Sequence, residues 1–213
     1  MDHDTAPPAA ATFVSGQTAV CVPTLSRQEA YFSVKRYGVV DSVDEYQRWM
    51  TLEEAFFLAT TGHIHIETLS TQGAMWAAFT SADDSFPSRY TAYALYRSRG
   101  WIVQSGLLYG VTFVLYRMSP DIVHAEYMVY VHDTTSSCAL SWQLLQMLTR
   151  LAEDVKKTVL VCEVQRASDW DASLMYMGLV CKELCFRHWP ALFTEGASFA
   201  MAESHAIPKR TRS

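Results

Sequence analysis

Hydrophobic residues recur with a helical period in the first half of the chain. The run LEEAFFLAT has apolar residues at three- and four-residue steps, and Thr51 with Glu54 forms a capping box that predicts where this helix starts. Ser88 is a candidate N-cap for a second helix, RYTAYALYRSR, and Gly100 follows it in the C-cap position. Earlier, YFSVKRYGVV suggests a short strand pair and DSVDEYQRW a polar helix.

After Gly100 the pattern changes to that of strands. The segments LLYGVTFVLYR and AEYMVYVH read as strands, and TVLVCEV is a nearly continuous apolar run, typical of a strand buried on both faces. A strongly amphipathic helix precedes that run, with Leu140, Leu144, Met147, Leu148 and Leu151 on one face. A final strand pair ends at LCFRHW. The pattern predicts an α+β N-terminal part followed by a mixed α/β C-terminal domain, whose central mixed sheet is flanked by helices.

The same patterns divide the chain into four segments. We expect a flexible N-terminus at 1–25, a helical α+β domain at 26–97, a mixed α/β domain at 98–195 and a flexible tail at 196–213. The first residues lack the basic region of a signal peptide, and no apolar run approaches the ~20 residues that span a membrane.

Composition limits the kind of partner. The 213 residues carry a net charge of −5, whereas a protein that coats nucleic acid without sequence preference has a basic excess. Any RNA contact must therefore come from a local patch, with partner subunits supplying the rest. Five scattered cysteines argue against a disulfide framework. His63 and His65 form an HxH pair, which we interpret as a surface or edge feature because two residues do not make a metal site.

Three residues of complementary chemistry flank the predicted strands. Tyr116 ends one strand, His124 opens the next, and Lys157 precedes the buried strand. A phenol can accept a proton from a ribose 2′-hydroxyl, an imidazolium can donate one to a 5′-oxygen, and an ammonium can stabilise the charged phosphorane between them. Each residue alone has a simpler explanation, as a packing aromatic, a surface histidine and a snorkelling lysine.

The surrounding residues add specificity. They occur in this order: Tyr93, Arg97, Arg99, Gly100, Trp101, Gly106, Leu107, Tyr109, Gly110, Phe113, Tyr116 and His124. This order resembles the C-terminal domain of tRNA-splicing (tRNA-intron) endonucleases, which typically show Y-x-x-(F/L/Y)-R-x-(R/K)-G-(Y/W)-x-V, then G-(L/I)-(K/Q)-(F/Y)-G-x-D-F-x-x-Y, then a histidine. The resemblance covers about residues 45 to 190.

The lysine is placed by a second match. RLAEDVKK resembles the family's R-x-A-H-S-V-R-K, so that Arg150, Val155 and Lys157 align without a gap. The choice between Lys156 and Lys157 stays open, although the Val155 match favours Lys157. The sequence also departs from the family pattern. Thr112 replaces an aspartate, Leu108 replaces a lysine or glutamine, and two acids precede the lysine pair.

The resemblance implies a function and a site. It is closest to the eukaryotic catalytic subunit that cuts the 5′ splice site of pre-tRNA, within a heterotetramer and without a metal or other cofactor. Tyr116, His124 and Lys157 would be catalytic, and the products would carry a 2′,3′-cyclic phosphate and a 5′-hydroxyl. Arg150 and Trp189 would bind a bulged base between them. The expected compartment is the nucleus, with the cytoplasm as the alternative.

Two other functions fit parts of the sequence. The chain could be a non-catalytic structural subunit of the same assembly, although such members usually lack a complete triad. A metal-dependent nuclease of the restriction type needs an acid with a lysine two residues later. Glu163 is present in TVLVCEVQR, but residue 165 is glutamine.

Overall fold

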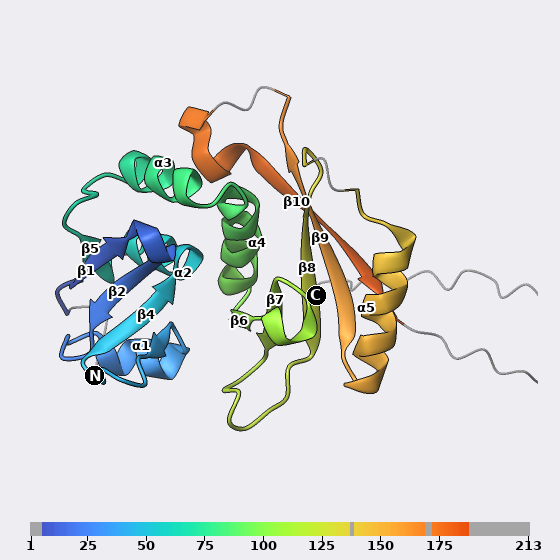
Figure 1. Cartoon of the computed structure of the whole chain (residues 1–213), viewed down its shortest axis with the longest axis horizontal. Coiled ribbons are helices and arrows are strands. Elements are labelled where there is room, and N and C mark those ends of the chain that lie inside the picture. Colours follow the sequence, from blue (N-terminus) through green and yellow to red (C-terminus); the bar gives the residue numbers. More distant parts are fainter. Residues whose placement is uncertain (1–5, 137–138, 169–171, 188–213) are drawn as a thin grey trace, which may run out of the picture.

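Two five-stranded sheets, one in each half of the chain, lie on either side of helix α4 (Figure 1). The computed structural model describes residues 6–136, 139–168 and 172–187. The chain thus forms an N-terminal α+β part and a C-terminal mixed sheet flanked by helices, as the sequence predicts. Within the described residues, no helix is both long and apolar enough to span a bilayer.

The N-terminal sheet has the strand order β3-β4-β2-β1-β5, with β1 and β5 parallel and the other neighbours antiparallel. Its strands are β1 (Ala9–Val14), β2 (Ala19–Pro23), β3 (Val39–Val40), β4 (Gln47–Thr51) and β5 (Ile64–Ile66). Its helices are α1 (Glu29–Lys35), α2 (Leu52–Thr60) and α3 (Gln72–Ala82), and a short 3₁₀ turn, η2 (Ser15–Gln17), joins β1 to β2.

The C-terminal sheet has the strand order β10-β9-β8-β7-β6, with only β8 and β9 parallel. Its strands are β6 (Ile102–Ser105), β7 (Phe113–Tyr116), β8 (Tyr127–Asp133), β9 (Thr158–Arg166) and β10 (Leu179–Phe186). Helix α4 (Phe86–Ser98) covers one face and α5 (Trp142–Asp154) the other. The 3₁₀ turns η3 (Leu107–Tyr109) and η4 (Ala172–Gly178) complete the chain.

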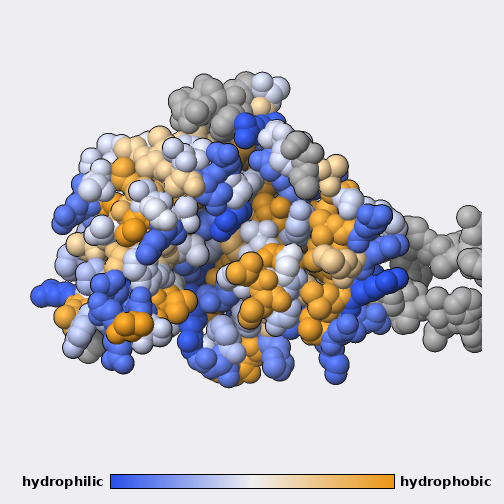
Figure 2. Space-filling model, in the orientation of Figure 1, coloured by the Kyte–Doolittle hydropathy of each residue, from blue (hydrophilic) through white to orange (hydrophobic). Residues whose placement is uncertain are grey.

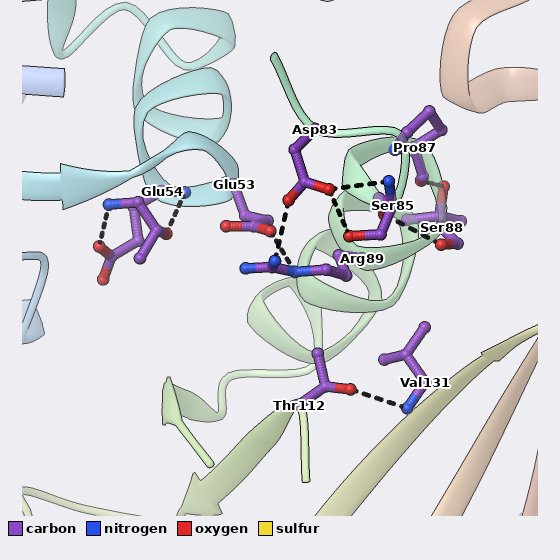
Figure 3. A network of polar contacts seen from close by, with 11 residues as sticks. Glu53, Glu54, Asp83, Ser85, Pro87, Ser88, Arg89, Thr112 and Val131 are labelled. Atoms are coloured by element: carbon purple, nitrogen blue, oxygen red, sulfur yellow. Dashed lines mark hydrogen bonds and ion pairs between the residues drawn. The ribbon is translucent and has the colours of Figure 1, made fainter. Parts of the chain in front are cut away.

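The start of α4 is tied to the rest of the molecule by polar contacts (Figure 3). The Arg89 guanidinium pairs with the buried Glu53 of α2 at 2.7 Å and with Asp83 at 3.0 Å. Thr112, which departs from the family pattern, accepts a hydrogen bond from the Val131 backbone N–H at 3.1 Å. A hydroxyl therefore joins the start of β7 to β8 at this position.

Local signals confirmed two of the predicted helix ends. Thr51 Oγ1 accepts the Glu54 N–H at 3.3 Å and the Glu54 carboxylate accepts the Thr51 N–H at 3.1 Å, so the capping box is present. Gly100 has a φ of +86° just after α4, and the Trp101 N–H reaches back to the Tyr96 carbonyl. This pattern is the Schellman motif, which favours glycine.

Other predictions for the N-terminal half were wrong. Residues 9–14 and 19–23 form β1 and β2, although the sequence suggests a flexible segment to residue 25. The expected strand in YFSVK is α1, and the expected helix in DSVDEYQRW is a turn followed by β4. Ser88 is buried inside α4, which begins at Phe86, and is not its N-cap. Pairing between strands overrode weak local patterns in β1, β2 and β4.

Candidate active site

The three chemistry-bearing residues lie at one end of the C-terminal sheet. Leu115 pairs with Tyr127 across β7 and β8, and Tyr127 pairs with Thr158 across β8 and β9. One residue further out, Tyr116 ends β7 and Lys157 precedes β9. His124 lies in the segment that enters β8, three residues before that strand begins. The antiparallel β7–β8 pair and the parallel β8–β9 pair thus bring all three residues to the same end of the sheet, where these strands begin or end.

Tyr116 and Lys157 also share a face. Side chains alternate along a strand, and Tyr116 and Val114 both belong to the apolar cluster under α5, as do Val159 and Val161 on β9. Lys157 continues that alternation, two residues before Val159. β8 lies between β7 and β9, so these two strands are two strand spacings, roughly 10 Å, apart. A phosphate placed between them could contact the Tyr116 ring from β7 and the long Lys157 side chain from β9.

The end of α5 determines which lysine occupies that position. Lys156 adopts a left-handed conformation with φ +54°, and its N–H bonds to the Glu153 carbonyl at 3.0 Å. The Lys157 N–H bonds to the Ala152 carbonyl at 2.7 Å. These two bonds form a Schellman motif with a lysine where glycine is usual. The turn leaves Lys156 exposed and delivers Lys157, which is half-buried, to the α5 face of the sheet.

Tyr109 is a site neighbour that the chemical argument from the sequence did not single out. The Lys157 Nζ lies 5.2 Å from the centroid of the Tyr109 ring and donates to the Val155 carbonyl at 3.3 Å. Among the described residues, no carboxylate forms an ion pair with Lys157. The tyrosine was visible only as one matched position in the family pattern.

The environment of Tyr116 raises the pKa of its phenol, whereas a general base would be expected to have a lowered pKa. Burial raises the pKa of the Tyr116 phenol above its usual value of 10.0, and the neighbouring Tyr109 raises it further. The phenol is therefore protonated at neutral pH. Its proton must leave when substrate binds if Tyr116 is to act as a base.

Of the two residues expected to bind a base, the structure describes one. Arg150 is exposed on α5, whereas Trp189 lies outside the described residues.

The histidine pair lies in the N-terminal sheet. His63 stacks on Tyr31 with ring centroids 4.2 Å apart, and His65 is exposed on β5, the outer strand of that sheet. The HxH pair is thus the edge feature that the sequence suggests. Within the part of the chain that the structure describes, no three His, Cys, Asp or Glu side chains gather as a metal site.

Comparison with known proteins relates the C-terminal half of the chain to one protein family. Residues 86–172 match the family model of the tRNA intron endonuclease catalytic C-terminal domain, and this range holds Tyr116, His124 and Lys157. The match to this family is one of residues 86–172 and not of the whole chain. The matched range begins at α4, includes Tyr116, His124 and Lys157, and ends after β9.

Relatives with similar sequences carry one subunit name. The tRNA-splicing endonuclease subunit Sen2-1 of Arabidopsis thaliana is 37% identical over 136 residues, which are 60% of this chain and 57% of that one. The subunit Sen2 of Mus musculus is 35% identical over 137 residues, or 59% of this chain and 30% of that one. The subunit SEN2 of Saccharomyces cerevisiae is 37% identical over 82 residues, or 38% and 21%. The chain therefore spans less than two thirds of the length of each relative.

Proposed function

We propose that the protein is the catalytic subunit of a tRNA-splicing endonuclease that cuts pre-tRNA at an exon–intron junction. The observation that carries this proposal is the strand register. It brings a tyrosine, a histidine and a lysine to one end of the sheet, within the range that matches the tRNA intron endonuclease catalytic domain. The names of the relatives support a role in tRNA splicing. The resemblance in sequence to the subunit that cuts the 5′ splice site favours that site as the position of the cut.

The proposed reaction is a transesterification without a metal. As substrate binds, Tyr116 loses its phenolic proton to solvent. The phenolate then takes the proton of the ribose 2′-hydroxyl, and the 2′-oxygen forms a bond to phosphorus. The bond from phosphorus to the 5′-oxygen then breaks, and His124 donates a proton to that leaving oxygen. Lys157 stabilises the charge on the pentavalent intermediate. The products carry a 2′,3′-cyclic phosphate and a 5′-hydroxyl.

The substrate and partner contacts extend this proposal. Arg150 and Trp189 would hold a bulged base of the pre-tRNA between a guanidinium and an indole. The acidic chain would work inside a heterotetramer with other endonuclease subunits, because its net charge of −5 does not suit it to hold a tRNA alone. β10 is the outer strand of its sheet and offers an edge for pairing with a subunit. We place the assembly in the nucleus, with the cytoplasm as the alternative.

The deciding experiment is cleavage of an intron-bearing pre-tRNA by the assembled complex with His124→Ala in this subunit. His124 is exposed and precedes β8, so this variant should fold and assemble normally. We expect cleavage at one junction to be abolished while the other junction is still cut. His132→Ala, a histidine inside β8, is the matched control.

Two results would refute the proposal. Undiminished cleavage at both junctions by His124→Ala would make this chain a non-catalytic subunit, the second candidate function. Complete inhibition of the unmodified complex by EDTA, with rescue by magnesium, would instead point to metal-dependent chemistry.

A further inference from the structure

A groove of about 440 Å³ lies where the N-terminal half meets the outer strand of the C-terminal sheet. Its walls come from α1 and the turn after it, the C-terminal end of α2, the end of α4 and the start of β6. The side chains that matter in it are three aromatics and three cations: Tyr31, Tyr37, Trp101, Lys35, Arg97 and Arg117. Figure 2 shows strongly hydrophilic residues gathered where the two halves meet.

The cations and aromatics of this groove alternate. The Arg97 guanidinium lies 4.0 Å from the centroid of the Tyr37 ring, and that of Arg117 lies 4.8 Å from the Trp101 ring. Tyr31 stacks beside Tyr37 with centroids 5.9 Å apart. Alternation of this kind serves ligands that carry both flat rings and negative charge.

Charge in the groove is only partly neutralised within the protein. Arg117 forms two hydrogen bonds to Glu126, at 2.7 and 2.8 Å, while Arg97 Nη2 is buried and has no hydrogen-bond partner among the described residues. Lys35 is exposed and forms no ion pair within the described ranges. The groove thus keeps a local positive charge in a chain whose net charge is −5.

The walls of the groove are held together across the two halves. Arg97 Nη1 donates to the Lys35 carbonyl at 3.1 Å, and Gln104 Nε2 donates to the Arg36 carbonyl at 2.7 Å. The Arg36 guanidinium in turn pairs with Asp121, in the loop between β7 and β8. The end of α1 is therefore fixed against β6 and that loop, so that a ligand would meet a pre-formed surface.

The groove opens at the same end of the sheet as the candidate active site. Ile102, which lines it, pairs with Tyr116 across β6 and β7, and Arg117 directly follows Tyr116 in the chain. Neighbouring strands lie roughly 4.8 Å apart, so a polymer held in the groove would lie within a few strand widths of Lys157, at the end of the sheet.

We propose that this groove binds a single-stranded stretch of RNA substrate next to the cleaved phosphate, an inference that rests on the proposed function. Lys35 would meet a phosphate and Arg97 would add positive charge from the wall of the groove, while Trp101 would stack on a base. An acidic protein segment would use the cations but would leave the aromatic faces without a matched partner. The interleaving therefore favours RNA.

The test measures binding of RNA that is not cut. The full chain carrying His124→Ala is titrated into a fluorescently labelled single-stranded RNA of about ten nucleotides, within the usual site sizes for such grooves. Anisotropy is read over a series of KCl concentrations. Lys35→Ala should weaken binding and lower the slope of log K against log salt by about 0.7, the value expected for one lost phosphate contact on a single strand.

A second variant and a matched control sharpen the result. Trp101→Leu should weaken binding on the order of tenfold with little change in the salt slope, because a stacking surface is lost and no charge is removed. Arg27→Ala removes an exposed cation near the opposite end of α1 and should leave both quantities nearly unchanged. Circular dichroism checks that each variant is folded.

The outcomes separate this inference from the proposed function. Equal affinity and equal salt slope for Lys35→Ala and Arg27→Ala would overturn the RNA groove, whatever the cleavage assay shows. Unchanged RNA binding together with loss of co-purifying subunits would also overturn it, in favour of an acidic protein segment. Weakened RNA binding by Lys35→Ala would support the groove even if His124→Ala left pre-tRNA cleavage intact.

Discussion

Two adjacent lysines follow α5, and the structure predicts that only one of them serves the reaction. We expect Lys157→Ala to slow the cleavage step about a hundred- to thousandfold, since loss of one group that stabilises transition-state charge costs about 2.7–4 kcal/mol. The side chain shares its sheet face with Tyr116 and contacts Tyr109, where a cation over a ring contributes about 1 kcal/mol to folding. The change should therefore reduce the rate far more than the stability.

Lys156 provides the matched control. It is exposed, and its φ of +54° costs a residue with a side chain roughly 1–2 kcal/mol. Lys156→Ala should leave the rate within about twofold, a change of about 0.4 kcal/mol. Lys156→Gly should keep the rate and raise the free energy of unfolding by about 1 kcal/mol, because glycine accepts this conformation without strain.

The assay is single-turnover cleavage of an intron-bearing pre-tRNA by the assembled complex, with enzyme in excess so that product release does not limit the rate. Urea unfolding of the isolated chain gives the stability changes. The reasoning is refuted if Lys156→Ala loses the activity and Lys157→Ala keeps it, or if both variants cut normally. In either case, the sheet face shared with Tyr116 would not identify the active lysine.

Two further predictions concern stability. Gly106→Ala should destabilise the protein by about 1–3 kcal/mol, because the added Cβ would lie 2.5 Å from Val111 Cγ2 and 2.8 Å from the Val111 carbonyl. In contrast, Gly73→Ala in α3 meets nothing within 4 Å and should stabilise by about 0.5–1 kcal/mol; equal effects in urea unfolding would contradict the packing argument. Burial raises the pKa of the Glu54 carboxyl above 4.5, so its contribution to stability is complete below that pH and is lost as the pH rises through the folded-state pKa. The stability cost of Glu54→Gln, measured by urea unfolding from pH 4 to 7, should therefore shrink as the pH rises; a cost that grows with pH would show that the hydrogen bonds to Glu54 outweigh its burial.

The sequence by itself determined those features that depend on neighbouring residues. The capping box of Thr51 and Glu54, the turn at Gly100 and the apolar face of α5 are local, because each is set by contacts within a few residues. The types and order of the proposed catalytic residues were also readable, since they follow the chain from Tyr116 to Lys157. These signals sufficed to predict the α/β class of the C-terminal half.

Only the tertiary structure decided features that depend on distant pairing. AAATFV and AVCVP carry weak strand patterns and become β1 and β2 because β5 and β4 pair with them from far along the chain. The position of Lys157, and not Lys156, beside the start of β9 required the Schellman turn and the β8–β9 register, and the aromatic–cation groove required Arg97 to reach the end of α1. No local rule encodes such contacts, because their free energy comes from burial and pairing between segments that meet only after the chain has folded.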